Sequence, residues 1–143
     1  PRGNRAGTTN GALAFTTTVG VIVRVHYRTA YGGTPAHVSS AAGLTVVHVL
    51  VIGIAYLTDF NYIPPKEFDK LKGVDTLVIN ALRKEAHISH FTLGEALHVS
   101  HLVSPRQTYL THISHQMGRQ AQEEPALPEN VRFAYDGLSI ETP

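Results

Sequence analysis

The fold is best read from residues 45–59, which end with Ile54-Ala-Tyr-Leu-Thr-Asp59. Up to Thr58 this stretch is almost wholly apolar and β-branched, which is typical of strands buried on both faces. The run is too long for one half-buried strand, so we expect one or two buried strands broken near Gly53. Asp59 then places a carboxylate at the carboxyl end of the run.

Helix and strand signals alternate after this stretch. After a loop over 61–65, residues 66–72 suit a short helix that Pro65 can begin and Gly73 can end. Residues 74–80 predict a second buried strand, and residues 81–91 show no clear period and read as a loop.

A second helix signal begins at Thr92, which stands three residues before Glu95 in capping-box spacing. A third strand over 106–111 follows and ends at His112. Strand, helix, strand, helix, strand predicts an α/β fold with parallel neighbours. In such sheets ligands collect beyond the carboxyl ends of the strands, which here are Asp59, Asn80 and His112.

The two ends of the chain carry further strand signals. Residues 19–26 predict a strand in the first part, where the composition is β-rich. Near the other end, residues 131–135 and 138–141 flank the turn dipeptide Asp136-Gly137, so we expect a β-hairpin there.

Composition divides the chain unevenly. All eleven acidic residues and every lysine lie from Asp59 onward, and residues 1–58 carry only arginine as a charged type. Because ordinary domains are about 25% charged, we treat 1–51 as a β-rich segment of unclear origin and 52–143 as a separate unit. That first segment is either a genuine β-rich segment or a stretch that is not the native N-terminal half.

Other global properties narrow the function classes. Without cysteine, any transition metal must be held by His and carboxylate groups. A formal charge of +1 does not suggest a nucleic-acid partner. The sequence has no uninterrupted apolar run of about eighteen residues, the length typical of a membrane-spanning helix, and no basic-then-apolar signal pattern at its start. The expectation is therefore a cytoplasmic protein without a membrane partner.

Histidine is the most informative residue type. Six of the nine histidines fall between residues 87 and 115, and imidazole is the commonest metal ligand and neutral-range acid or base. Asp59 and His112 at predicted strand ends suggest a metal site. His98 and His101, three apart on the predicted helix, read as solvent-facing. His48, inside the first strand run, is either a buried histidine or an upstream metal ligand.

Several segments together resemble one family. They are Ile54-Ala-Tyr-Leu-Thr-Asp-Phe60, Leu77-Val-Ile-Asn-Ala-Leu-Arg83, His87-Ile-Ser-His-Phe-Thr92, Thr108-Tyr-Leu-Thr-His-Ile-Ser-His-Gln-Met-Gly118 and Leu127-Pro-Glu-Asn-Val-Arg-Phe-Ala-Tyr-Asp-Gly-Leu138. Their order and spacing resemble the C-terminal half of a metallo-β-lactamase-fold hydrolase, in the branch that acts on phosphoribosyl cyclic phosphates. The resemblance implies an αββα sandwich, of which residues 52–141 form about half.

The resemblance also implies roles. Asp59 matches the carboxylate that bridges two divalent metal ions, Zn or Mn, and His112 matches a ligand of the second ion. His90 resembles the general acid or phosphate-binding histidine, and His115 and His87 would support the site from outside the ligand set. The implied reaction is hydrolysis of a phosphodiester, a small cyclic phosphate ester, by a metal-bridging hydroxide.

The sequence departs from this family in one important respect. The family's motif His-x-His-x-Asp-His, which supplies four ligands, does not occur here. The remaining ligand of the first metal is also without a clear match, because His48 lies too close to Asp59 in sequence and His26 lies too far from it. Two hypotheses therefore stand. The chain is a metal-dependent hydrolase whose other ligands lie elsewhere, or it is a non-catalytic half-fold fragment or interaction module. The sequence does not decide whether it forms a homodimer.

Overall fold

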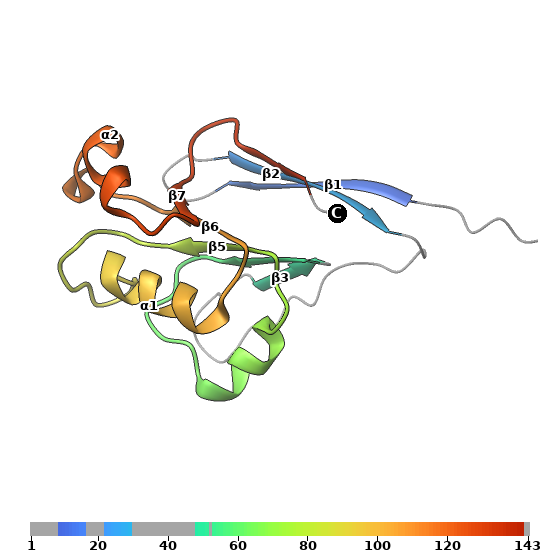
Figure 1. Cartoon of the computed structure of the whole chain (residues 1–143), viewed down its shortest axis with the longest axis horizontal. Helices are drawn as coiled ribbons and strands as arrows, with labels where there is room; N and C mark the ends of the chain where they lie inside the picture. Colours follow the sequence, from blue (N-terminus) through green and yellow to red (C-terminus); the bar gives the residue numbers. More distant parts are fainter. Residues whose placement is uncertain (1–8, 17–21, 30–47, 52, 142–143) are drawn as a thin grey trace, which may run out of the picture.

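The computed structural model describes residues 9–16, 22–29, 48–51 and 53–141, with side chains from residue 53 to residue 140. Within these ranges, eight strands form two sheets (Figure 1). The three-stranded sheet has the order β1 (Thr9–Thr16), β2 (Ile22–Thr29), β8 (Ser139–Glu141). The five-stranded sheet has the order β3 (His48–Val51), β4 (Ile54–Leu57), β5 (Thr76–Asn80), β6 (Gln107–Thr111), β7 (Val131–Phe133).

The apolar run that ends at Asp59 forms two strands. β3 and β4 pair antiparallel, with Val51 opposite Ile54, so the chain reverses between them. Gly53 lies in this turn at φ +83°, a left-handed conformation that glycine adopts without a steric penalty. The expectation of two strands broken near Gly53 is confirmed for the part of the run that the structure describes.

From β4 onward the five-stranded sheet is parallel. β4 pairs with β5, β5 with β6 and β6 with β7, all in parallel register. The side chains of β4 and β5 are buried throughout, as expected for strands covered on both faces. The carboxyl ends of β4, β5 and β6 consequently lie side by side at one edge.

Helical segments connect these strands. The 3₁₀ helix η1 (Pro65–Leu71) begins at Pro65 and precedes Gly73, which has φ +76°. The α-helix α1 (Leu93–Val103) begins after Thr92, and both bonds of the predicted capping box are present. The shorter segments are η2 (His115–Met117), α2 (Gln120–Glu123) and η3 (Glu124–Ala126).

The core lies between the parallel strands and the elements that cover them. α1 contributes Ala96 and Val99, which belong to the same buried cluster as Leu77, Ile79 and Leu110 of the sheet. In Figure 1, α1 and η1 lie on one side of the five-stranded sheet and the three-stranded sheet lies on the other. The described residues thus form part of an αββα sandwich, and the predicted fold class is confirmed in this sense.

The predicted C-terminal β-hairpin is wrong. Residues around Asp136-Gly137 do turn, with the Leu138 amide donating to the Tyr135 carbonyl at 3.1 Å. However, β7 pairs with β6 in one sheet, and β8 pairs in parallel with β2 in the other. The turn dipeptide sets a local change of direction, whereas the strand partners come from segments far away in sequence.

The predicted N-terminal strand is confirmed over 22–26 and extends further toward the C-terminus than we expected. β2 begins at Ile22, beyond part of the predicted 19–26, and continues to Thr29 in antiparallel pairing with β1, which we did not predict. Positions 19–21, 45–47 and 52 of the predicted strands lie outside the described residues. Among the helices that the structure describes, none is long and apolar enough to cross a membrane.

Candidate metal centre

Two of the site residues follow parallel strands in the same unusual backbone conformation. Asp59 stands two residues after β4 at φ +60°, and His112 directly follows β6 at φ +57°. Residues other than glycine seldom adopt this left-handed region. Such conformations persist where the surrounding structure holds them, and they cluster at functional sites.

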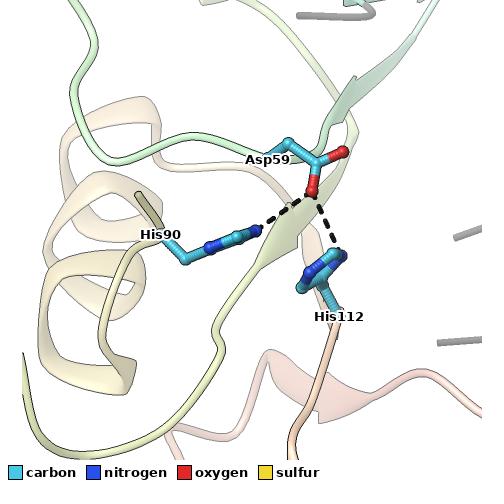
Figure 2. Close-up of side chains that lie close together, drawn as sticks. All are labelled: Asp59, His90 and His112. Carbon is cyan, nitrogen blue, oxygen red and sulfur yellow. Dashed lines mark hydrogen bonds and ion pairs between the residues drawn. The ribbon is translucent and has the colours of Figure 1, made fainter. Parts of the chain in front are cut away.

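These two residues meet His90 at the carboxyl edge of the sheet (Figure 2). Asp59 Oδ1 lies 3.1 Å from His90 Nε2 and 3.3 Å from His112 Nδ1. The two imidazole rings stack with centroids 4.4 Å apart. Asp59 and His112, which we expected at the ends of parallel strands, therefore meet at one edge, and His90 lies in the same cluster. Their role as metal ligands stays a prediction.

The three side chains fit a divalent cation. Each offers one ligand atom, and these atoms lie within 4.8 Å of one another. His112 Nδ1 is buried and has no hydrogen-bond partner among the described residues, although a carboxylate oxygen stands 3.3 Å away. The Asp59 side chain remains 39% exposed, so the cluster opens to solvent. A buried nitrogen without a partner beside an accessible carboxylate suits a cation bound from the solvent side.

Electrostatics favour the ligand form of His112. Burial is the main cause that lowers the pKa of His112; the charge of Asp59 opposes this, and His90 adds to it. The net direction keeps the imidazole neutral, which is the form that binds metal. On β4, burial followed by the charge of Asp59 raises the pKa of Tyr56 to about 12, so this phenol stays protonated.

Neighbouring residues of the same loop contact the His90 ring at Nδ1. Its Nδ1 lies 2.7 Å from Ser89 Oγ and 3.3 Å from His87 Nδ1, while its Nε2 faces Asp59. Ser89 Oγ also approaches His87 Nδ1 at 3.2 Å. These contacts leave Nε2 as the ring nitrogen available to the cluster. We expected His90 to face the cluster without being a ligand, and this role stays a prediction because its Nε2 is also placed to bind an ion.

The other histidines to which we gave a role or a surface position lie in different settings. His87 supports His90 as described, whereas His115 is exposed at the first position of η2, so its expected supporting role stays a prediction. His98 and His101 are exposed on α1, as expected. His48 begins β3 opposite Leu57, near the carboxyl end of β4. Its side chain lies outside the described residues, and its role as a metal ligand stays a prediction.

Comparison with known proteins decides the family. The family model described as the beta-lactamase superfamily domain matches residues 9–113, more than half of the chain. The chain belongs to this superfamily. The match includes most of the segment before Ile52, where we saw no resemblance, and β3–β4 pairing also crosses that point. The division into 1–51 and 52–143 stays a prediction.

Two similar proteins extend the comparison of this superfamily member. A new diphosphatase from the PhnP family, whose crystal structure is known, shares 31% sequence identity with this chain. The structural match has a TM-score of 0.67 and covers 76% of this chain and 42% of that one. An octanoyltransferase of Porphyromonas gingivalis (strain ATCC BAA-308 / W83) is 33% identical over 86 residues, which are 59% of this chain and 18% of that protein. The chain thus spans less than half of either relative. The metallo-β-lactamase fold is confirmed, in part of its extent.

Proposed function

We propose that this chain carries part of the active site of a metal-dependent hydrolase of phosphodiesters, with a small cyclic phosphate ester as substrate. The observation that carries the proposal is the convergence of Asp59, His90 and His112 at the carboxyl edge of the parallel sheet. Membership of the superfamily and the similarity to a PhnP-family diphosphatase support it.

Asp59 and His112 are the residues that would hold the ion. A divalent ion, Zn or Mn, would lower the pKa of a water molecule and stabilise charge on phosphoryl oxygens. The Asp59 carboxylate is positioned to contribute negative charge through Oδ1, and buried, neutral His112 to donate a lone pair from Nδ1. Both residues lie within two positions of the end of a parallel strand, and both have a left-handed backbone conformation.

His90 is the candidate proton donor to the leaving oxygen. Its Nε2 faces the cluster at 3.1 Å from Asp59, and Ser89 and His87 hold the opposite nitrogen. A positioned imidazole is the side chain that most often transfers protons in catalysis. The start of α1 is not part of the proposed binding site for the substrate phosphate. Its Leu93 amide already donates to the Arg83 carbonyl, and its Glu95 amide donates to Thr92 Oγ1.

One observation favours a second candidate, a non-catalytic half-fold. The cluster offers three ligands among the described residues, and the sequence has no His-x-His-x-Asp-His motif to supply four more. A single weakly held ion, or none, would leave a domain that keeps the fold without hydrolysing a phosphodiester.

Metal content and activity of the purified chain distinguish the two candidates. Elemental analysis after dialysis against Zn²⁺ or Mn²⁺, with His98→Ala as the matched control and Asp59→Asn as the test variant, reports the site directly. Stoichiometric metal that is lost in Asp59→Asn and kept in His98→Ala, together with hydrolysis of bis(4-nitrophenyl) phosphate, supports the hydrolase. A small fraction of one equivalent and no hydrolysis would overturn it in favour of the half-fold.

A further inference from the structure

Asn80, the last residue of β5, is a buried polar residue outside the cluster itself. Its side chain is fully buried. Its Oδ1 accepts a hydrogen bond from the Phe60 amide at 3.0 Å, and its Nδ2 donates to the Phe60 carbonyl at 2.9 Å. The side-chain amide therefore pairs with both backbone groups of the residue that directly follows Asp59.

The same Phe60 carbonyl connects to the loop that carries His90. It accepts a second hydrogen bond from the Phe91 amide at 2.6 Å, and the Phe91 carbonyl accepts one from the Leu82 amide at 2.9 Å. Phe91 directly follows His90 in the chain. The residues next to Asp59 and next to His90 are thus joined to each other and to the segment 80–82.

The loop that carries His112 is tied to this segment as well. The Ala81 amide donates to the Thr111 carbonyl at 2.9 Å, and the Ser114 amide donates to the Leu82 carbonyl at 2.9 Å. Chain neighbours of all three cluster residues therefore meet at 80–82. The two contacts of Asn80 come from its side chain. A substitution at Asn80 can therefore remove them without changing any residue of the loops.

We propose that Asn80 is a positioning residue for the cluster, holding Asp59 and His90 in the arrangement that binds the ion. Asp59 has a left-handed backbone that an aspartate seldom adopts unless its surroundings hold it. The paired bonds to Phe60 hold the chain one residue later. The consequence for metal binding rests on the proposed function, whereas the consequence for the geometry of the metal-free cluster does not.

The test uses the full chain in two matched variants. Asn80→Leu removes both bonds to Phe60 at similar volume. Thr108→Val is the control, because Thr108 is also fully buried and its Oγ1 lies 2.7 Å from Ser100 Oγ, its hydrogen-bond partner among the described residues, nearer the amino end of β6. We expect both variants to lower the Tm, by roughly 5 °C. A Tm change alone therefore does not separate positioning from general stability.

The separating readout is the NMR signature of the cluster without metal. In Asn80→Leu the imidazole resonances of His90 and His112 should shift, and the Phe60 and Phe91 amides should exchange with solvent at least about tenfold faster, relative to the Thr108→Val control. Unchanged imidazole resonances and equal exchange in the two variants would overturn the proposal, whether or not the wild-type chain binds metal.

Titration with Co²⁺ then tests the expected consequence for metal binding. We expect Asn80→Leu to weaken Co²⁺ binding by about tenfold or more, as is usual when a partner that orients a ligand is lost, and Thr108→Val to leave it unchanged. If Asn80→Leu does not fold, Asn80→Asp replaces it, because it keeps an acceptor for the Phe60 amide. The added negative charge alone would strengthen cation binding, so weaker binding supports positioning and stronger binding contradicts it. A wild-type chain that binds no Co²⁺ would overturn the proposed function alone, since the metal-free NMR comparison still decides the role of Asn80.

Discussion

The carboxyl edge of the parallel sheet and the outer face of α1 each carry a pair of histidines three residues apart. At the edge, His90 Nε2 approaches Asp59 and His87 supports the ring from behind. On α1, His98 and His101 are exposed to solvent. The spacing is the same in both regions, yet only the first pair contributes to a candidate metal centre.

The difference lies in what faces each pair. Parallel strands deliver their following residues to one edge, so Asp59 and His112 come from distant parts of the chain to meet His90. On the helix, the acidic group three residues before His98 is Glu95, and its Oε2 already accepts bonds from the Thr92 amide and hydroxyl. Histidine spacing is thus the same in both regions, and what differs is the carboxylate that lies within reach of two imidazoles at the sheet edge.

Removing the shared carboxylate should have the largest effect. Asp59→Asn keeps a side chain that tolerates the left-handed backbone but removes the charge. We expect metal affinity to fall by about two orders of magnitude or more and hydrolysis of bis(4-nitrophenyl) phosphate to reach background, measured by metal titration and initial rates. Metal binding equal to that of the wild-type chain would remove Asp59 from the ligand set.

His90→Ala should separate the acid from the ligands. We expect turnover to fall by about two to four orders of magnitude with metal content unchanged, because the variant loses a proton donor. Elemental analysis and kcat measured side by side give the answer. Loss of metal would instead make His90 the third ligand of the cluster, and unchanged turnover would return it to an ordinary loop histidine.

Acid should destabilise the metal-free protein through His112. Burial lowers the folded-state pKa of His112 below its unfolded value of about 6.5. The unfolded chain then binds the proton more readily. This contribution to the free energy of unfolding is therefore present above about pH 6.5 and is lost as pH falls through the lowered pKa.

Thermal unfolding of the metal-free chain in EDTA, at about pH 7.5 and about pH 5, measures this dependence. The matched variant His112→Asn, which suits the left-handed backbone, should show a smaller fall in Tm between the two pH values. An equal fall in both proteins would assign the acid sensitivity to other groups.

The helix pair should show the smallest effect. His98→Ala and His101→Ala together should change the free energy of unfolding by no more than about 0.5 kcal/mol, because both side chains are exposed. Metal content and turnover should stay at the wild-type level. A loss of metal in this double variant would break the contrast between the two regions.

Local signals predicted the elements that flank the site. The capping box at Thr92, the break at Gly53 and the strand that ends at Asn80 were readable because each depends on residues close in sequence. The same locality explains the error at the C-terminus. The Asp136-Gly137 turn was readable, but the partner of each strand was not, since β8 pairs with β2 more than a hundred residues earlier.

The order of residues already shows which groups are available: a carboxylate after β4, an imidazole after β6 and a histidine-rich loop before α1. It also determined that parallel strands bring the first two to one edge, because the order of strands and helices requires it. Three facts are visible only in the folded chain: the His90 ring turns toward Asp59, His112 Nδ1 is buried with no hydrogen-bond partner among the described residues, and Asn80 hydrogen-bonds to Phe60. Those facts depend on side-chain direction and long-range hydrogen bonds, which packing sets and residue spacing does not.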